Sequence, residues 1–538
     1  MDQNGGDALS IEARPNQKFA RRFRTFDYGG RAEPDQGWGR MAFGVEEPTQ
    51  ETSSADVGGR APAAVSRQDA WIDGEPARVM FVGRSIGHFT YYDSVLTALC
   101  DRGAEVELLL DKKWSAQWLR GLNLAQLEAF SARYPKFRFA WLTRRQDGWR
   151  DNLFDLRELR TYRSYLTRPE TTPFYIGRWR ALLRPSWRRQ ADRPWFDALV
   201  RSPFTEAVIR LVEQMSPADP AVMQRIRAFD PHLVICSPMN LRFSEETDYA
   251  KAAKKLGIPL AAITISWDNL STKGLFHIEP DTLFVWNRYQ LEDALRIQKI
   301  PRDKLSVAGS PFFDKWFSDE LEVVERRAFC RIVGLDAKRP ILLYLGSSKN
   351  IAADESWFVR KVKEYFVTSG KGGVDQVQIL IRPHPANAKV FGKIETDDVK
   401  VWPKGGVLPE SDEEFRMMRS SFAHSVGVLG INTSAMIDSV LADKPTFTVK
   451  LKRYVDTQAN AVHFRYLEEA GALSVCTHIG DLTLRLRDLM KGRDTKRAER
   501  RAFARSFARP EGLERPAGDV IAGYALSLAR ARAARMSS

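Results

Sequence analysis

The chain has 538 residues, 43% of them hydrophobic, which is enough for two large domains and excludes wholesale disorder. Its 82 Lys and Arg residues against 68 Asp and Glu residues give a formal charge of +14, which favours nucleic acid, an anionic membrane surface or phosphate-bearing small molecules as partners. The four cysteines stand far apart with no CxxC pair, which excludes a disulfide scaffold and a zinc ribbon and suits a reducing cytoplasm.

Residues 1–72 are rich in Gly, Ala, Ser, Asp and Gln and show no helical or strand period, so we expect a disordered tail. No segment approaches the roughly 20 consecutive apolar residues that span a bilayer. The N-terminal region also lacks the basic and then apolar order of a signal peptide. We therefore expect neither a membrane span nor a secretory signal.

The first predicted strand is Arg78–Gly83. A helical pattern over residues 90–102 follows, Gly103 is placed to end it, and the next strand is Glu105–Leu110. A strand, a helix and a strand within about 35 residues predict a parallel sheet. The same alternation predicts strands at 232–236, 260–265, 282–286 and 305–308, with helices at 245–256 and 288–298.

A second series begins at Pro340. It predicts strands at 341–345, 377–381, 427–430 and 446–449, with helices at 354–369, 413–421 and 434–441. We therefore predict an α/β fold of two Rossmann-like parallel-sheet domains that face a cleft. The predicted boundaries are 73–312 for the N-terminal domain, 313–490 for the C-terminal domain and 491–538 for closing helices.

Residues 141–190 do not fit this alternation. They hold twelve arginines, five acidic residues and nine aromatic residues, and we predict a helical insertion that reaches about residue 225. One interpretation is amphipathic helices that dock on an anionic membrane or glycan. The other is helical hairpins that cover the sheet and turn solvated basic faces outward. The basic stretch Lys496–Arg509 is interpreted as a closing helix, so no nucleic-acid partner is expected.

Open parallel sheets bind ligands beyond the carboxyl ends of their strands, so the loops after strands matter most. One such loop is Arg382-Pro383-His384-Pro385. Two prolines stiffen it, which suits an imidazole that hydrogen-bonds a phosphate, and Arg382 adds a fixed positive charge. The alternative is a packed loop histidine without a ligand.

A second loop follows the strand 427–430 and carries hydroxyl groups at the start of a helix. Thr433 and Ser434 can cap that helix or bind an anion, and Asp438 lies one turn later, where it can accept hydrogen bonds from a ribose. Ordinary helix capping is the alternative. Asn432 precedes the hydroxyls, and a third small polar loop after the strand 341–345 holds Ser347 and Ser348.

The most polar loop of the first domain follows the strand 260–265. In it Asp268 can serve as a base, Lys273 can compensate charge and Trp267 can form a wall against a sugar, with Asn269 beside them. The alternative is a turn whose Asp and Asn bond their own backbone. In the first loop of the domain, near residues 83–88, Gly87 and His88 allow close approach of a ligand.

Cofactor chemistry is not indicated by the motifs. The glycines near residue 83 do not follow GxGxxG, the seven histidines are dispersed, and no P-loop or acidic metal motif is present. We expect neither a metal ion nor a resident cofactor.

Together these residues resemble the GT-B glycosyltransferases, and among them bacterial surface-carbohydrate biosynthesis proteins, with features of CDP-glycerol glycerophosphotransferases and CMP-sugar transferases. The resemblance covers about residues 78–140 and 225–490. Its motifs are Ser266–Gly274, Val307–Pro311 with Asp314, Arg382–Pro385, Asn432–Ser434 with Asp438, and Lys444-Pro445.

The resemblance implies a role for each matching residue. His384, Thr433 and Ser434 would bind the phosphates of a nucleotide-activated sugar, Asp438 would hold its ribose, and Asp268 would be the base. The implied acceptor is a glycan or a lipid-linked carrier, served by a cytoplasmic protein on the inner face of the membrane. The alternatives are a sugar-nucleotide epimerase of the UDP-GlcNAc 2-epimerase type and a non-catalytic binding protein with this fold.

Overall fold

The computed structural model describes residues 71–537 except 73–74, 117–120, 319–321, 370–371 and 410. The predicted tail therefore lies outside the described residues, apart from its last two. These two, Trp71–Ile72, form strand β1, which pairs antiparallel with β2 (Glu75–Pro76). They were expected in the tail and are instead part of a small two-stranded sheet.

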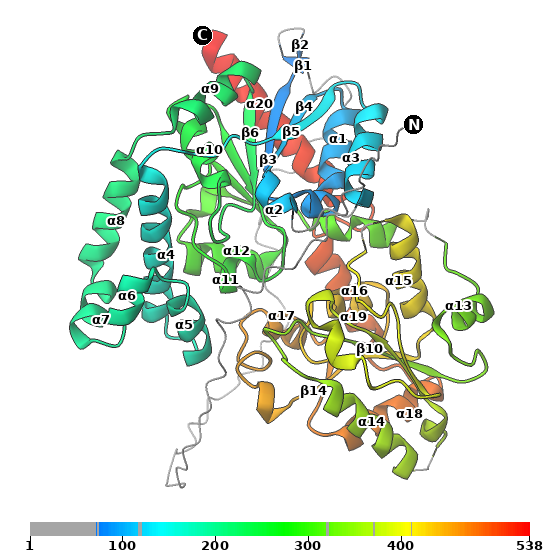
Figure 1. The fold of residues 1–538 in the computed structure, drawn as a ribbon. Helices are drawn as coiled ribbons and strands as arrows, with labels where there is room; N and C mark the ends of the chain where they lie inside the picture. The colour runs from blue at the N-terminus through cyan, green and yellow to red at the C-terminus, as the bar shows by residue number, and fades with distance from the viewer. Residues whose placement is uncertain are drawn as a thin grey trace, which may run out of the picture. The chain divides into compact units, whose positions relative to one another are not determined.

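The first large sheet has seven parallel strands in the order β5-β4-β3-β6-β7-β8-β9 (Figure 1). Val79 lies opposite Val106 on one side and Leu233 on the other. Because both faces are covered, the central strands are continuous apolar runs. The strands are β3 (Arg78–Gly83), β4 (Glu105–Leu110), β5 (Phe137–Trp141), β6 (Leu233–Ser237), β7 (Leu260–Ile263), β8 (Thr282–Val285) and β9 (Leu305–Val307).

Alternate residues of β3 enter two different apolar cores. Phe81 packs with α1 (Asp93–Asp101), α3 (Gly121–Arg133) and α20 (Ala517–Ser537). Val82 packs on the other face with α9 (Pro220–Phe229) and α10 (Glu246–Lys255). Four short helices complete this lobe at its strand ends: α2 (Lys112–Ala116), α10 (Glu246–Lys255), α11 (Asn269–Thr272) and α12 (Arg288–Asp293).

The second large sheet has six parallel strands in the order β12-β11-β10-β13-β14-β15. They are β10 (Ile341–Leu345), β11 (Gln378–Arg382), β12 (Val399–Val401), β13 (Gly427–Gly430), β14 (Thr446–Val449) and β15 (Leu473–Cys476). The helices of this lobe are α13 (Arg326–Val333), α14 (Ser356–Ser369), α15 (Asp412–His424), α16 (Ala435–Leu441), α17 (Phe464–Glu469), α18 (Ile479–Met490) and α19 (Arg497–Phe503).

Both sheets share one strand order. In each, the first strand lies third from one edge, the next two strands are added toward that edge and the later strands are added on the other side. The order therefore reverses between β3 and β6 in the first sheet and between β10 and β13 in the second. This confirms the expected α/β fold of two Rossmann-like sheets, and it places the ligand-binding crevice of each at that point.

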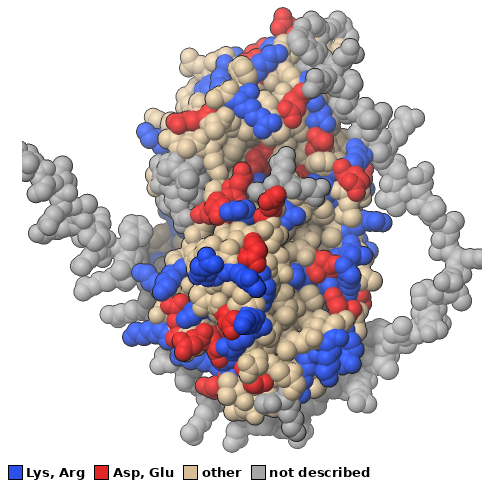
Figure 2. Space-filling model, turned by 90° about the vertical axis from the view of Figure 1, so that its right-hand side faces the viewer, with Lys and Arg blue, Asp and Glu red and all other residues tan. Residues whose placement is uncertain are grey.

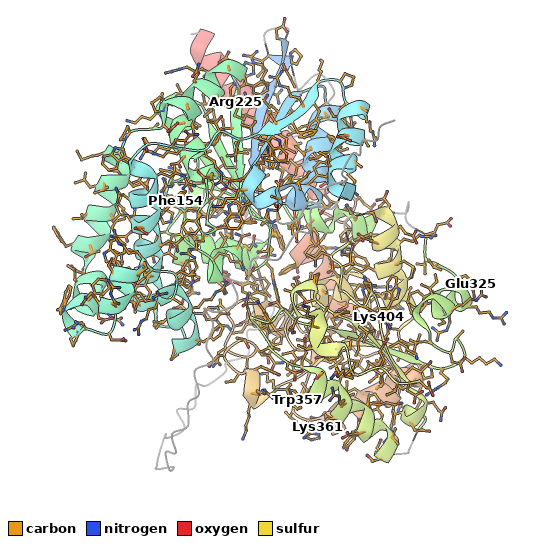
Figure 3. The ribbon with its side chains drawn as sticks, viewed as in Figure 1. Phe154, Arg225, Glu325, Trp357, Lys361 and Lys404 are labelled. Atoms are coloured by element: carbon orange, nitrogen blue, oxygen red, sulfur yellow. The ribbon has the colours of Figure 1, made fainter. Side chains whose placement is uncertain are left out.

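The segment between β5 and β6 is helical, as predicted for the insertion. Its helices are α4 (Trp149–Thr167), α5 (Pro173–Arg180), α6 (Pro185–Gln190), α7 (Pro194–Arg201), α8 (Pro203–Met215) and α9 (Pro220–Phe229). Proline opens each of α5 to α9, where its missing N–H costs no hydrogen bond. Phe154 of α4, labelled in Figure 3, belongs to this insertion. Its ring meets that of Phe243 edge to face at 5.6 Å between ring centroids, which joins the insertion to the loop after β6.

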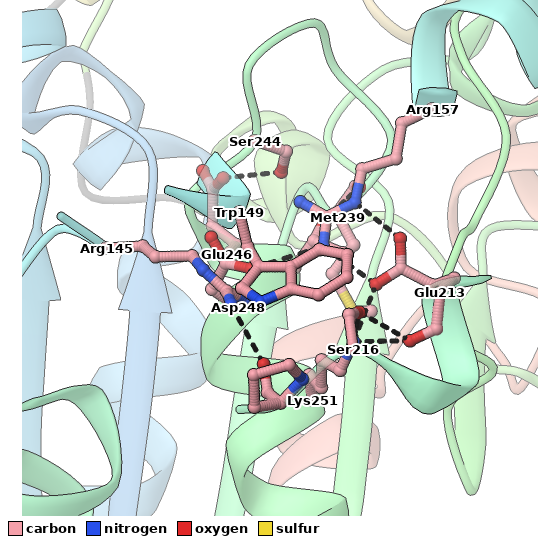
Figure 4. Close-up of polar contacts among 12 residues, drawn as sticks. Arg145, Trp149, Arg157, Glu213, Ser216, Met239, Ser244, Glu246, Asp248 and Lys251 are labelled. Carbon is pink, nitrogen blue, oxygen red and sulfur yellow. Dashed lines mark hydrogen bonds and ion pairs between the residues drawn. The ribbon is translucent and has the colours of Figure 1, made fainter. Parts of the chain in front are cut away.

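The second interpretation of this insertion expected its arginines on solvated faces. Several of them are buried instead. Arg157 is buried and donates to both carboxylate oxygens of Glu213 at 2.9 Å and to Asp248 at 3.2 Å (Figure 4). Lys251 of α10 also contacts Glu213, at 3.3 Å. Arg160 is buried too and donates to Glu206 at 2.9 Å. This network fastens α4 and α8 to α10.

Helix α20 returns to the first lobe, where it packs along α1. Asp314, in the segment between the two sheets, holds the start of α20: its carboxylate accepts from the backbone N–H groups of Ala517 and Gly518, each at 2.9 Å, and from Arg509 at 3.0 Å. Asp314, one of the residues of the family resemblance, therefore anchors the start of α20 to the segment between the two sheets.

Charge is mixed on one face of the molecule. In Figure 2, Lys and Arg side chains alternate with Asp and Glu side chains across the visible surface. Within residues 71–537, as far as they are described, no helix has the length and apolar character needed to cross a membrane.

Candidate active site between the two sheets

A cavity of about 270 Å³ lies between the carboxyl ends of the two sheets. Loops after β10, β11, β12 and β13 line it from the second lobe, and loops after β3, β7, β8 and β9 line it from the first. Of the residues expected to bind the donor, Arg382, His384, Thr433, Ser434 and Asp438 line this cavity. Five of the side chains predicted from their position after strand ends therefore meet in one cavity.

Arg382 is the last residue of β11 and is 8% exposed. Its guanidinium donates to the Ser421 hydroxyl at 3.2 Å and lies 5.2 Å from the centre of the Trp402 ring. Among the described residues, no carboxylate lies within ion-pair distance of Arg382. Burial lowers its pKa to about 10, although the Glu414 carboxylate acts in the opposite direction, so the group stays charged at neutral pH at a free-energy cost.

His384 follows two residues later and has a defined orientation. Its Nδ1 accepts the backbone N–H of Ala386 at 3.1 Å, so the proton of the neutral ring lies on Nε2, where it can be donated to a ligand. Burial lowers the pKa of His384, which keeps the ring neutral at pH 7.

Close backbone packing fixes the loop that carries His384. A Cβ on Gly346 would lie 3.0 Å from Pro383 Cα, and one on Gly406 would lie 2.7 Å from the Pro383 carbonyl oxygen. Gly406 also has a φ of +66°, which favours glycine. The proline-flanked loop is therefore held from both sides by residues without side chains.

Thr433 and Ser434 supply two hydroxyls to the cavity. Ser434 is the first residue flanking α16, and its side chain makes no capping hydrogen bond. Neither hydroxyl has a hydrogen-bond partner among the described residues. The capping alternative is therefore wrong for Ser434, and both groups are free to bind a ligand.

Asp438 lies one turn into α16 and is buried. Its Oδ1 accepts the indole N–H of Trp316 at 2.7 Å. Burial raises the pKa of Asp438 to about 7, so a fraction of this carboxyl is protonated near neutral pH and can donate as well as accept a hydrogen bond.

Three other predicted donor-binding residues do not line the cavity. Asn432 is buried and donates to the Thr457 carbonyl oxygen at 2.6 Å. The Ser347 backbone N–H donates to Glu355 at 2.5 Å, and Ser348 follows it; their neighbours Leu345 and Gly346 reach the cavity instead. These residues shape the loops behind the cavity wall.

On the first lobe, Gly87, His88 and Trp267 line the cavity as expected for the acceptor side. His88 is half-buried, and burial together with the Arg84 charge lowers its pKa to about 4. Trp267 is almost fully buried and meets His463 of the second lobe edge to face at 4.6 Å between ring centroids.

Asp268 points elsewhere and does not line the cavity. It accepts the hydroxyls of Ser266 and Thr272, each at 2.7 Å, and pairs with Lys273 at 2.9 Å. Burial raises its pKa, but Lys273, His463 and the two hydroxyls outweigh burial and hold the pKa well below the ordinary value. A carboxylate held this way is a weak proton acceptor.

The neighbouring predicted residue Asn269 is also internal. Its Oδ1 accepts the backbone N–H groups of Ile265 and Ser266, both at 3.0 Å, which orders the loop after β7. Asn269 and Lys273 are therefore behind the cavity wall rather than on it.

Sequence reasoning missed several lining residues. Lys315 reaches the cavity from the segment after β9 and pairs with Asp93 at 2.9 Å, and Phe313 and Trp286 add apolar surface nearby. Lys315 lies just beyond the motif Val307–Pro311. It could have been found by examining the segment after β9 in the same way as the segments after the other strands. Within the described residues, no group of three or more His, Cys, Asp or Glu side chains is arranged to hold a metal ion.

Comparison with known proteins gives weak structural likenesses. No family model and no curated protein matches the chain. Among solved structures, it is similar to a UDP-GlcNAc 2-epimerase from Neisseria meningitidis bound to UDP-GlcNAc (11% identity, TM-score 0.45, 83% of this chain and 99% of that one). It is also similar to Acinetobacter baumannii MurG (11%, 0.40, 82% and 98%) and to a glycosyltransferase from Rickettsia africae (10%, 0.43, 86% and 97%). At such identities and scores, these likenesses assign neither a family nor an activity.

Proposed function

We propose that the chain is a glycosyltransferase that moves a sugar, or a polyol phosphate, from a nucleotide-activated donor to a surface-polysaccharide or lipid-linked acceptor. The observation that carries this proposal is Arg382, a buried guanidinium with no described carboxylate within ion-pair distance, beside His384 on the cavity between the sheets. A buried charge of this kind is unfavourable until an anion joins it. The phosphate of a nucleotide is an anion of suitable size.

In this proposal the donor lies mainly on the second lobe. Arg382 and Nε2 of His384 offset the charge of the leaving phosphate, and the hydroxyls of Thr433 and Ser434 donate further hydrogen bonds. The charge is thus offset by the protein's own groups, with no step assigned to a metal ion. One such donor contributes about 10²–10³ in rate where it meets developing charge. Asp438 is assigned to the ribose hydroxyls.

For deprotonation of the acceptor hydroxyl we favour His88 over the Asp268 expected from the sequence. His88 lines the cavity, and burial together with the Arg84 charge lowers its pKa to about 4, so its ring is unprotonated at pH 7 and has a free nitrogen for the hydroxyl proton. Asp268 is committed to Lys273 and two hydroxyls.

The acceptor is proposed to be a growing glycan or a lipid-linked carrier, met by a cytoplasmic protein on the inner face of the membrane. The alternative epimerase reaction needs several acidic groups around the sugar. Among the described lining residues Asp438 is the one carboxylate, which favours transfer over epimerisation.

The test is thermal stabilisation by a panel of CMP-, CDP-, UDP- and GDP-linked sugars. A true donor at about 100 times its dissociation constant should add about 2.7 kcal/mol of stability. His384→Ala should cut this gain at the same ligand concentration to about 0.3–1.4 kcal/mol, because loss of a hydrogen bond to a charged group weakens binding by about 1.5–3 kcal/mol. His478→Ala is the matched control, because Nδ1 of His478 also accepts a helix N-terminal N–H, that of Asp481 at 3.2 Å, but lies outside the cavity.

Two outcomes would contradict the proposal. One is the absence of stabilisation by every member of the panel. The other is formation of a sugar-nucleotide isomer when the stabilising donor is incubated with the protein alone, which would assign the site to an epimerase.

A further inference from the structure

A second hollow, of about 530 Å³, lies between the insertion and the rest of the first lobe. It is lined from α8, from the end of α10, from the segment 276–279 before β8, and from the end of the π-helix η4 (Ala294–Gln298). None of the described residues that line it also lines the cavity between the sheets. The hollow is large enough for a small molecule, and the proposed transfer reaction makes no use of it.

Positive charge predominates in this hollow. Among the described lining residues, six are lysine or arginine and two are glutamate, and each glutamate pairs with a cation that does not line the hollow. Lys255 and Lys299 are exposed, and neither has a carboxylate within ion-pair distance in the described part of the chain. Both ammonium groups are therefore available to an anionic ligand.

Two arginines on the wall of the hollow share one carboxylate. Glu206 pairs with Arg160 at 2.9 Å and with Arg210 at 2.7 Å, and Arg163 lies 3.7 Å from it. Burial lowers the pKa of Arg160 although Glu206 opposes this effect, and the Arg210 charge lowers the pKa further. The wall thus holds more positive charge than its carboxylate balances, and an anion in the hollow would offset the excess.

His277 lines the hollow with a hydrogen-bond donor that the protein does not use. Its Nδ1 lies 3.3 Å from Nη1 of Arg160. A guanidinium only donates, so Nδ1 accepts and the proton of the neutral ring lies on Nε2. Burial and the charges of Arg160 and Arg157 hold the pKa of His277 well below its usual value, although Glu213 acts in the opposite direction. The ring is therefore neutral, and Nε2 makes no hydrogen bond with the described residues.

Apolar side chains form another part of the lining. Ile209 belongs to the core of the insertion, whereas Phe276 and Ile300 belong to a core of the first lobe. All three are buried. The hollow therefore lies where these two cores meet. It combines cationic groups with apolar surface suited to the organic part of a ligand.

We propose that this hollow is a second anion-binding site, which takes a soluble small molecule that carries a phosphate or diphosphate group. Lys255, Lys299 and Nε2 of His277 hold the phosphate oxygens, and Phe276 and Ile300 contact the organic part. A phosphate group carries a charge of about −1.5 to −2, so it balances two unpaired lysines better than a carboxylate does. The site goes beyond the proposed function and does not depend on it.

The test is isothermal titration calorimetry of the full chain with inorganic pyrophosphate. The Arg382→Gln variant serves as the parent protein, because it removes the anion-binding group assigned to the cavity between the sheets. We expect this parent to bind one pyrophosphate. Adding Lys255→Glu with Lys299→Glu should raise the dissociation constant about tenfold or more, because each ion pair lost and each repulsion gained changes it by up to about fivefold.

The matched control is Lys338→Glu with Lys393→Glu in the second lobe, added to the same parent. Both lysines are exposed, and neither has a carboxylate within ion-pair distance among the described residues. The control makes the same change of net charge away from the hollow and should leave the dissociation constant unchanged. The proposal is overturned if the parent binds no pyrophosphate, or if the hollow variant and the control variant bind it equally well.

A lipid headgroup presents the same phosphate chemistry as a soluble ligand, and flotation with phosphatidic acid vesicles separates the two. We expect the parent not to float. Vesicle binding that is lost in the Lys255 and Lys299 variant would overturn the assignment to a soluble molecule.

Failure here is separable from failure of the proposed function. The wild-type chain should bind two pyrophosphates, of which Arg382→Gln removes one and the lysine variant weakens the other. A wild-type chain that binds pyrophosphate through the lysines alone would lose the proposed donor site and keep the second site. One that binds it through Arg382 alone would do the reverse.

Discussion

Replacement of Arg382 by glutamine should change stability and binding in opposite directions. Burial lowers the pKa of Arg382 to about 10, which corresponds to about 3 kcal/mol of unfavourable free energy for the charged group in the ligand-free protein at neutral pH. The variant loses the hydrogen bond to Ser421 and the contact with Trp402, each worth about 1 kcal/mol. The free protein should therefore unfold at an equal or higher denaturant concentration.

Binding should weaken in the same variant. A hydrogen bond to a charged group contributes about 1.5–3 kcal/mol, so the dissociation constant of the nucleotide-sugar should rise about 10- to 150-fold. Urea denaturation of the free protein gives the first quantity and isothermal titration calorimetry gives the second. A variant that is clearly less stable yet binds its donor with wild-type affinity would refute the assignment of Arg382 to the phosphate.

Arg157→Gln is the matched control for this experiment. Arg157 is also buried, but it is paired with Glu213 and Asp248, so its loss leaves two carboxylates uncompensated. Breaking such a pair costs about 3–5 kcal/mol. The folded fraction of this variant should bind the donor with unchanged affinity, which separates a structural arginine from a ligand-binding one.

Two further substitutions test the buried Asp438 carboxyl and the contact between Asp314 and the start of α20. Burial raises the pKa of Asp438 to about 7, so the folded chain retains a proton that the unfolded chain releases. Relative to Asp438→Asn, the wild-type free energy of unfolding should therefore fall by up to about 4 kcal/mol as pH rises from about 4 to about 7, which urea titrations would measure. A pH-independent difference between the two proteins would contradict this. Asp314→Asn should cost about 3–5 kcal/mol, because it leaves Arg509 without its buried partner, and hydrogen exchange should accelerate first in α20. Equal acceleration in α20 and in β10 would argue against a local clamp.

The central strands of both sheets were predictable because burial on two faces demands continuous apolar runs, as in β3 and β10. The strands that were missed, β5, β12 and β15, lie at the sheet edges. Strand β5 reads Phe-Arg-Phe-Ala-Trp and is only partly buried, and β12 is three residues long with a lysine at its centre. Such segments carry too weak an apolar signal to be recognised.

Side-chain partners across the chain were beyond the reach of local patterns. The arginine count of residues 141–190 suggested a basic surface, but Arg157 is buried and is neutralised by Glu213, which lies 56 residues later in the chain. The cavity was easier to predict, because strand ends in a parallel sheet meet at one edge and so bring Arg382 and Ser434 together. Asp268 sits at a strand exit too, but its own loop turns the carboxylate toward Lys273.

The return of α20 to the first lobe determines the order in which the two lobes can complete their folding during synthesis. Val520, Ile521, Leu526 and their neighbours complete the apolar core that α1 and β3 begin. A ribosome adds these residues about 440 positions after β3, when the strands of the second sheet have already been made. The first lobe is therefore synthesised first but completes its folding last. A nascent chain interrupted before residue 517 would expose an incomplete apolar core to chaperones and proteases.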